Sequence, residues 1–512
     1  MKKNARILIL SGTGLAVLGG VTAALLLTAP AKDNDIAAET GAEDQTLAIE
    51  EAALLTLCDR EESDTASVEV TNESGTFSIT PSGSTDDDGN IEWTITDIAA
   101  APLNHSTLST DVGNVISLEA KEFAEEVADS SELAKYGLDA PRASVTAKFT
   151  DGTEFTLKVG IDVPNSSTAL YITADDKNVY TLNKSRVSDF LGNKYGFVEL
   201  EAVPDYDATS EEVKKMTVER FDLEVPLVIE SIKPENADDI QVYSYRMVTP
   251  YSAYADLTDS PNFMYSIFGL KAASCEGVGL NDKVRELAGL TEPLCVITTE
   301  SSIKTYTVTL GKAIVDTTTN EDGTETQKVS GFYGISSEVP DVLYRFDASS
   351  IAAMQIYPEQ LISKMFLMPY IYSLDSVTYS DAEGRTLDIG VKTVKAATEE
   401  EQDEYKFTLN GEPTADQPVK DLYQYFISAS GEELYFDEDK GDLIAEINYN
   451  YSDKKDGING KDTVRFYSSN TDRKVIIELN GSNLFKTRKM YTTQLFSNVD
   501  NFLGGKEIVL TY

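Results

Sequence analysis

The chain has 512 residues, and its 86 acidic residues outnumber its 43 basic ones to give a net charge of -43 at neutral pH. A surface of this charge repels nucleic acids and anionic lipid headgroups, so neither is an expected ligand. Disorder is not expected, because 41% of the residues are hydrophobic and Tyr and Phe number 26 and 19.

The first 31 residues form a segment of their own. A short basic start precedes an uncharged apolar run from Ile7 to Ala31, which is long enough to cross a bilayer as a helix. Acidic residues follow the run and place the rest of the chain outside the cytoplasm. Residues 1–31 are therefore predicted to be a single-pass anchor in a bacterial-type plasma membrane. The small residues at Ala29-Pro30-Ala31 also allow a signal peptide that is cleaved after Ala31.

An acidic, polar linker is predicted over residues 32–53. After it, one plan occurs three times, and the predicted modules are residues 54–205, 206–365 and 366–512. Each module opens on alternating apolar residues broken by a turn, which is typical of a strand pair. Val68, Val218 and Val377 mark these openings. An aromatic strand, a helix and several further strands are predicted to follow in each module.

The three predicted helices begin near Asp111, at Ser260-Pro261 and at Asp416. Apolar residues three and four positions apart give each helix one stripe that can be buried. The predicted fold class is therefore α+β. It has an N-terminal transmembrane helix and three tandem related modules, each a mostly antiparallel sheet with one or two helices on one face.

A Gly-Leu-x-x-Pro motif marks the first two modules. It reads Tyr136-Gly137-Leu138-Asp139-Ala140-Pro141 in the first and Gly289-Leu290-Thr291-Glu292-Pro293 in the second, and each is followed by a strand that reaches a further glycine. Glycine at this place suits a left-handed helix cap, and proline prevents the helix from continuing. The motif is therefore predicted to be structural. Its residues are Tyr136, Gly137, Leu138, Pro141, Gly160, Gly289, Leu290, Pro293 and Gly311.

The order of this motif, a strand, the turn Asp151-Gly152, a second strand ending at Gly160 and then Val179-Tyr180 resembles the bacterial family called domain of unknown function 4340. The likeness is best over residues 54–200, weaker over 210–365, and loose beyond 370. The resemblance implies a membrane-anchored extracytoplasmic protein of uncharacterised activity. It also implies an association with gliding-type ABC export components, namely a permease, an ATPase and another extracytoplasmic subunit. It brings no catalytic residues.

Motifs that carry chemistry are few. The single histidine, His105, lies in a polar connection and is predicted to be an ordinary loop or surface residue. No Gly-x-Ser-x-Gly or phosphate-binding loop occurs in the sequence. One His and three Cys are too few for zinc sites. We therefore predict no catalytic, cofactor-binding or metal-binding residue. Pairing of Cys275 with Cys295 stays open, as does calcium binding by the acidic loops at Asp86–Asn90 and Asp453–Gly460, since such residues also favour turns.

The apolar stretch from Met365 to Tyr372 is too short to span a bilayer. It is predicted to pack between the second and third modules, and an exposed patch that binds a partner is the alternative. The function that the sequence favours is a non-enzymatic accessory protein that binds a partner at the outer face of the membrane, as an auxiliary subunit of an ABC-type export system. The alternatives are a carboxylate-dependent cell-wall or polysaccharide hydrolase and a calcium-stabilised surface adhesin.

Overall fold

The computed structural model describes residues 54–126, 130–232, 243–320, 322–394, 404–454, 457, 459–470 and 473–512. These residues belong to one compact unit, Leu54–Tyr512. The predicted anchor at residues 1–31 and the linker at 32–53 lie outside the described residues. Within the described ranges, no helix is both long enough and apolar enough to cross a membrane.

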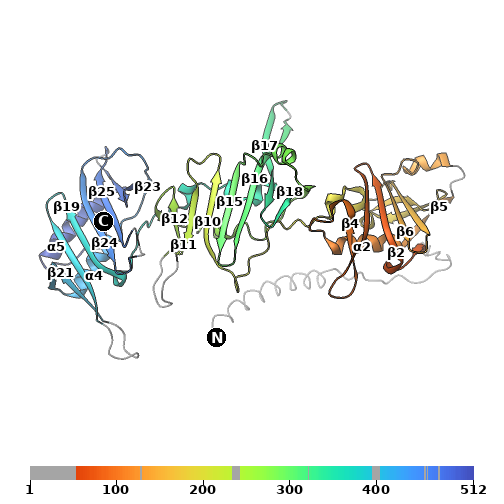
Figure 1. Ribbon diagram of the computed structural model, residues 1–512. Coiled ribbons are helices and arrows are strands. Elements are labelled where there is room, and N and C mark those ends of the chain that lie inside the picture. The colour runs from red at the N-terminus through yellow and green to blue at the C-terminus, as the bar shows by residue number, and fades with distance from the viewer. Residues whose placement is uncertain are drawn as a thin grey trace, which may run out of the picture. The chain divides into compact units, whose positions relative to one another are not determined.

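Three nine-stranded antiparallel sheets make up the described chain (Figure 1). The prediction of an α+β fold is therefore wrong, because the sheets dominate and the helices are few. The α-helices of the described ranges are α2 (His105–Ile116), α3 (Asp282–Leu287), α4 (Asp416–Phe426) and α5 (Lys489–Leu503). In the second sheet's module the only α-helix among the described residues is α3, which has six residues, so irregular segments cover that core.

Each sheet lies within one of the three residue ranges expected from the sequence. The first sheet contains β1 (Leu54–Asp59), β2 (Thr65–Asn72), β3 (Gly75–Thr85), β4 (Ile91–Ile95), β5 (Ser117–Glu126), β6 (Ala143–Phe149), β7 (Glu154–Asp162), β8 (Ala169–Thr173) and β9 (Asn178–Asn183). The second contains β10 (Val213–Arg220), β11 (Leu227–Ser231), β12 (Tyr245–Thr249), β13 (Ala253–Tyr254), β14 (Ser274–Val278), β15 (Cys295–Ser301), β16 (Thr305–Thr319), β17 (Glu325–Ser336) and β18 (Val339–Asp347). The third contains β19 (Leu374–Asp381), β20 (Thr386–Val394), β21 (Glu404–Leu409), β22 (Glu412–Pro413), β23 (Glu433–Leu434), β24 (Leu443–Tyr451), β25 (Lys461–Ser468), β26 (Lys474–Leu479) and β27 (Ser482–Arg488).

The three sheets share one order of eight strands. It is β4-β3-β2-β6-β7-β8-β9-β5 in the first, β12-β11-β10-β15-β16-β17-β18-β14 in the second and β21-β20-β19-β24-β25-β26-β27-β23 in the third. In each, three opening strands join a four-stranded meander, and the meander ends against a strand that comes before it in the sequence. The ninth strand differs, because β1 lies beside β5 whereas β13 and β22 lie beside β12 and β21.

The opening strands β2, β10 and β19 correspond residue by residue. In all three the pairing register shifts just after the first residue, at Thr65, Val213 and Leu374. The buried positions then follow one pattern, which makes Val68, Met216 and Val377 equivalent. Val218, which marked the second opening in the sequence, corresponds instead to Val70. The sequence comparison was thus two residues out of register, a shift that keeps the same face of the strand inward.

The first predicted helix starts earlier than expected. Helix α2 begins at His105, and the Asn104 side chain caps it by accepting a hydrogen bond from the Thr107 N–H at 2.9 Å. Asparagine is among the best residues for this position. Asp111 therefore lies in the middle of the helix, where it is buried.

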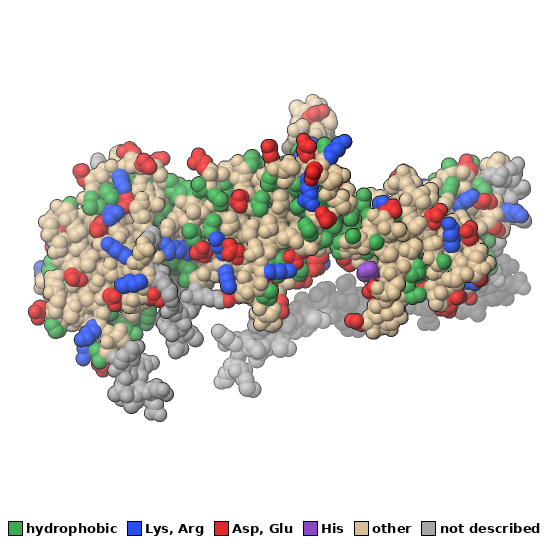
Figure 2. Space-filling model, in the orientation of Figure 1, with side chains coloured by type: hydrophobic (Ala, Val, Ile, Leu, Met, Phe, Trp, Pro, Cys, Tyr) green, Lys and Arg blue, Asp and Glu red, His purple; other side chains and the backbone are tan. Residues whose placement is uncertain are grey.

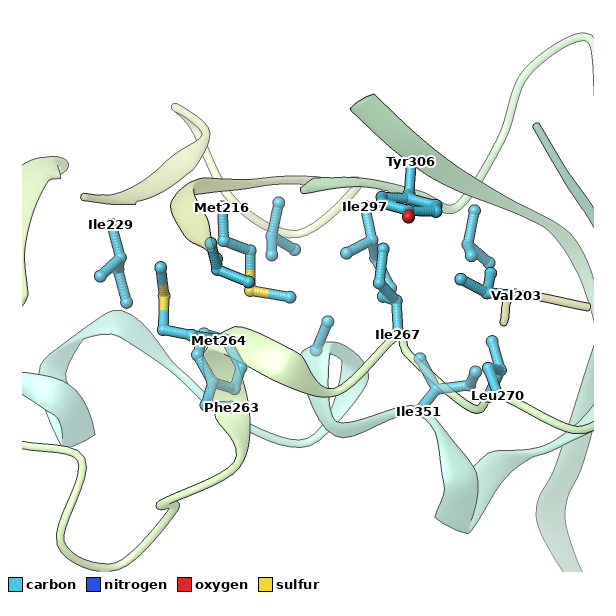
Figure 3. Packing of buried hydrophobic residues seen from close by; sticks show 14 of the residues in the cluster. Val203, Met216, Ile229, Phe263, Met264, Ile267, Leu270, Ile297, Tyr306 and Ile351 are labelled. Carbon is cyan, nitrogen blue, oxygen red and sulfur yellow. The ribbon is translucent and has the colours of Figure 1, made fainter. Parts of the chain in front are cut away.

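The second predicted helix is wrong. After Ser260-Pro261 the chain makes only a 3-10 turn, Phe263–Tyr265, and Gly269 then turns with a φ of +64°. The apolar residues that suggested a helix are nevertheless buried. Met264 and Ile267 pack beneath Met216 and Ile297 of the sheet (Figure 3). The spacing of the apolar residues thus predicted correctly which residues are buried, but turns rather than a helix set the path of the backbone. The third helix, α4, does begin at Asp416.

The apolar stretch from Met365 to Tyr372 packs against the third module. Phe366 and Leu367 are buried, and the Phe366 ring lies 5.9 Å from that of Phe485. The Tyr372 ring stacks on Tyr405 at 3.9 Å. Met365 remains 54% exposed, so most of this stretch, but not all of it, is internal packing.

Candidate functional site

The first Gly-Leu-x-x-Pro motif forms a tight turn at the end of a 3-10 helix, Ser130–Tyr136. Gly137 has a φ of +67°, and the Leu138 N–H donates to the Leu133 carbonyl oxygen at 3.1 Å, which is the closing bond of a helix C-terminal cap. A Cβ on Gly160 would lie 2.2 Å from the Tyr136 carbonyl oxygen. The two glycines therefore let the turn lie directly on β7.

The second motif builds the same contact at the end of α3. Gly289 has a φ of +74°, and the Leu290 N–H donates to the Arg285 carbonyl oxygen at 2.8 Å. A Cβ on Gly311 would lie 2.1 Å from the Ala288 carbonyl oxygen. Backbone approaches this close require glycine. The motif glycines thus hold the helix end against the second meander strand in both modules.

The remaining motif residues also have structural surroundings. Tyr136 and Leu138 are buried in a small cluster of their own, in which the Tyr136 ring meets Tyr171 edge-on at 4.9 Å. Leu290 is half-buried, and Pro293 directly precedes the residues that lead into β15. Pro141 lies at the surface, where it lines a hollow.

Two shallow hollows adjoin these turns. The first, about 580 Å³, is lined by Thr71, Glu73, Pro141, Arg142 and Ser144 among others. The second, about 560 Å³, is lined by Lys283, Glu286, Leu287, Glu292, Lys312 and Ala313 among others. Both mix acidic and basic side chains with neutral ones. Motif residues that were expected to be only structural therefore also border two open hollows at the surface.

One carboxyl pair of the first module joins a buried group, Asp111, to an exposed one, Asp189. Asp111 of α2 is 4% exposed and hydrogen-bonds to Asn114 and to Asp189 of the 3-10 turn Asp189–Leu191. Its Oδ2 atom is buried and makes no hydrogen bond. Burial and the charge of Asp189 raise the pKa of Asp111 to about 7. The pair joins α2 to this turn.

His105 is the first residue of α2 rather than part of a loop. Its Nδ1 lies 3.0 Å from the carbonyl oxygen of Trp93 on β4. This contact ties the start of the helix to the sheet, while His105 itself is an exposed, surface residue.

The cysteines cannot pair as they stand. Cys275 lies on β14 and Cys295 on β15, and β16, β17 and β18 separate these strands. Four inter-strand steps put them about 19 Å apart, whereas a disulfide needs Cα atoms within about 7 Å. Burial raises the pKa of Cys275 to about 11 and that of Cys295 to about 12, so both are unreactive thiols.

The acidic loop at Asp86–Asn90 is a self-contained turn. Asp86 Oδ1 accepts hydrogen bonds from the N–H groups of Asp88 and Asn90, at 3.0 and 2.8 Å. Part of the second acidic loop, Asp453–Gly460, lies outside the described residues. Among the residues that the structure does describe, no three or more His, Cys, Asp or Glu side chains come together as metal ligands would.

Sequence reasoning missed the longest hairpin of the chain. Strands β16 and β17 run past the rest of the second sheet (Figure 1), and we call residues 313–319 and 325–330 the arm. Asp322-Gly323 turns its tip, where Asp322 Oδ1 accepts from the Thr324 N–H at 2.9 Å. Asp-Gly between threonine-rich runs is a hairpin signal, and it could have been found in the sequence.

Residues 93–293 match the family model described as Domain of unknown function (DUF4340). No curated protein and no solved structure matches the chain. The matched range begins at Trp93 of β4 and ends at Pro293 of the second motif, so it includes both glycine turns. The resemblance to the family Domain of unknown function (DUF4340) is therefore confirmed over residues 93–293.

Proposed function

We propose that the protein is a membrane-attached, extracytoplasmic accessory protein that binds a partner protein as an auxiliary subunit of an ABC-type export system. The observation that carries the proposal is the strand order repeated in three sheets. Three copies of one sheet give the chain a large rigid surface, and such a surface suits a protein that binds partners in an assembly. Residues that bind are commonly held at the edges and loops of such rigid scaffolds.

The outer faces of the sheets are suited to contact with other molecules in water. In the first sheet, hydroxyl pairs join neighbouring strands, with Thr146 and Thr156 at 3.0 Å. In the third, Thr463 donates to Asn448 at 2.8 Å, and Arg465 bonds to Glu446 at 2.6 Å. These side chains are held in place by one another, so a partner would meet a preorganised polar surface and little side-chain freedom would be lost on binding.

The location and the export role rest on the sequence and on the family. The apolar run from Ile7 to Ala31 and its flanking charges support attachment at the membrane with the body outside. The family resemblance supports the link to a permease, an ATPase and a second extracytoplasmic subunit. The pair of Asp111 and Asp189 does not favour a hydrolase, because Asp111, one of its two carboxyl groups, is only 4% exposed.

The test is affinity purification of the full chain from native membranes through a C-terminal tag. We expect an ABC-type permease to co-purify. The matched control carries residues 1–53 fused to an unrelated soluble domain with the same tag, which separates binding by the sheets from proximity in the membrane. Recovery of no permease above that control would contradict the proposal. Accessibility of the sheets to protease added outside intact cells without an outer barrier tests the location separately.

A further inference from the structure

We infer that the edge of β16 beyond Gly311 accepts a β-strand from a partner protein. This inference rests on the proposed binding function and names the way in which binding occurs. Up to Leu310, β16 pairs with β15. Next along the same edge, the Leu294 N–H donates to the Leu310 carbonyl oxygen at 2.9 Å, and the Lys312 N–H donates to the Ala288 carbonyl oxygen at 2.7 Å. Beyond the end of β15, the glycine turn therefore makes the hydrogen bonds to this edge of β16.

From residue 313 to 319 the edge has no further strand. Within the described ranges this part of β16 pairs with β17 alone, so the backbone groups on its other side point away from the sheet. Such groups are a template for another strand, and proteins usually cover or shorten an edge of this kind. Here the edge is long and continues a ladder that the chain itself has already begun.

The first module shows that the fold does not need the arm. Strand β7 holds the same place in the shared order and ends two residues after Gly160, at Asp162. Strand β16 continues for eight residues beyond Gly311, to Thr319. Side chains from Val315 onward are exposed, and they contribute nothing to the core. A two-stranded ribbon is only marginally stable by itself, so this extension serves something other than the module's stability.

The arm carries an apolar contact point. Val315 and Val329 lie directly opposite each other on β16 and β17, so their side chains share one face. They are 48% and 40% exposed. Valine and threonine, which make up most of β16 here, are strong strand formers. An added strand would cover the valines on one face while its backbone completed the ladder.

The second hollow lies along the same edge. It is lined by α3 and the glycine turn on one side and by Lys312 and Ala313 at the base of the arm on the other. Leu287, at its rim, is 68% exposed. Figure 1 shows α3 beside the arm, and Figure 2 shows acidic and basic side chains together at its base. The hollow is placed to receive a side chain of the strand that continues past Lys312.

The net charge of the chain favours another protein over a second copy as the partner. A second copy would also carry a net charge of -43, and this repulsion opposes self-association. The occupant is therefore an extended segment of another protein, without acidic residues, that alternates apolar and hydroxyl side chains. Strand addition of this kind draws affinity from backbone hydrogen bonds and selectivity from alternate side chains.

The probe is a fluorescent ten-residue peptide of alternating Val and Thr with a Lys at each end, and its binding to the full chain is followed by anisotropy. A second peptide carries Pro at alternate positions and cannot complete the ladder. We expect the first peptide to bind and the second to bind at least tenfold more weakly. Equal binding of the two peptides, or no binding of the first, overturns the inference.

Two variants place the binding on the arm. In one, residues 315–329 are replaced by Asn-Gly, which closes the hairpin at its base. In the other, Val315→Lys removes the apolar contact, with Val225→Lys as the matched control because Val225 is 46% exposed elsewhere in the same module. We expect a loss of tenfold or more for the shortened chain and for Val315→Lys, and no change for Val225→Lys. Unchanged affinity in the shortened chain refutes the inference.

The purification described above separates this inference from the proposed function. If the full chain and the shortened chain recover the permease equally, the edge is not the docking site although the accessory function stands. If neither recovers it, the accessory function fails whatever the peptide does. Sedimentation measures the remaining alternative, because a dimer that disappears on shortening the arm would make a second copy the occupant and overturn the choice of partner.

Discussion

Replacing Asp111 with Asn should make the first module more stable at alkaline pH. In the folded chain Asp111 holds its proton up to a pKa of about 7, whereas its ordinary value is 3.8. Between these values the folded state binds a proton that the unfolded state has released, so stability falls as the pH rises. The stabilisation that the retained proton contributes is complete below pH 3.8 and is lost as the pH passes 7.

The size of the effect follows from the shift. Each pKa unit is worth about 1.36 kcal/mol, and about three units give a loss of about 4 kcal/mol between acid and pH 8. Asp111 is 4% exposed, so solvent screens this little. Asn cannot ionise, and its amide can still donate to Asp189. We expect Asp111→Asn to match the native chain near pH 4 and to exceed its stability by up to about 4 kcal/mol at pH 8.

Trp93, the single tryptophan, allows the measurement in this module alone. It is fully buried on β4, and its carbonyl oxygen contacts His105 of α2. Urea unfolding followed by its fluorescence at several pH values should give a midpoint up to about 2 M higher for the variant at pH 8, for a slope of about 2 kcal/mol/M. Asp59→Asn, at an exposed position of β1, controls for the change in net charge. If the free energy of unfolding of Asp111→Asn falls with pH as steeply as that of the native chain, the reasoning about the carboxyl pair is wrong.

Three further changes test other parts of the structure. Gly160→Ala should destabilise the first module by about 2 kcal/mol or more, because its Cβ would lie 2.2 Å from a backbone oxygen. Gly113→Ala, in open space on α2, should instead stabilise the module by about 0.5–1 kcal/mol. The stability of both variants is measured by Trp93 fluorescence. The three cysteines should all be free thiols, namely Cys58, Cys275 and Cys295. A thiol reagent should modify them only after the chain unfolds. A disulfide-linked peptide in a non-reducing digest would contradict the strand order. Phe366→Ala should lower the stability of the third module by about 3–5 kcal/mol, measured by calorimetry, whereas Met365→Ala at the exposed neighbouring position should have little effect.

The repeat could be read from the sequence because its landmarks are backbone requirements. Gly137 and Gly289 adopt left-handed conformations, and Gly160 and Gly311 lie under a carbonyl oxygen, so no other residue serves at these positions and their spacing is retained. The opening strands lack such a requirement. Any apolar residue can occupy an inward position, which is why Met216, the equivalent of Val68, was passed over for Val218.

The fold class could not be read in the same way. Phe263, Ile267 and Leu270 have helical spacing, yet they fill the core from a 3-10 turn and irregular chain. Periodicity reports which residues face inward, and it does not exclude a turn that achieves the same burial. The carboxyl pair was also invisible, because Asp111 and Asp189 are joined only when the turn at Asp189–Leu191 folds onto α2. The arm, in contrast, had a readable signal at Asp322-Gly323.

The shared strand order sets the sequence of events when the chain emerges from its N-terminal side. In every sheet the meander ends against a strand that comes before it in the sequence, as in the pairs Lys121 with Thr181, Cys275 with Tyr344 and Glu433 with Lys486. In the second and third sheets this strand lies at the edge, so it must wait, unpaired, until more than fifty further residues have appeared, whereas in the first sheet β5 can pair earlier with β1. A chain that is synthesised or threaded across a membrane gradually would expose β14 and β23 in turn, each open to aggregation during that interval. Safe delivery of this protein would then depend on a chaperone holding these strands, or on emergence fast enough to shorten the wait.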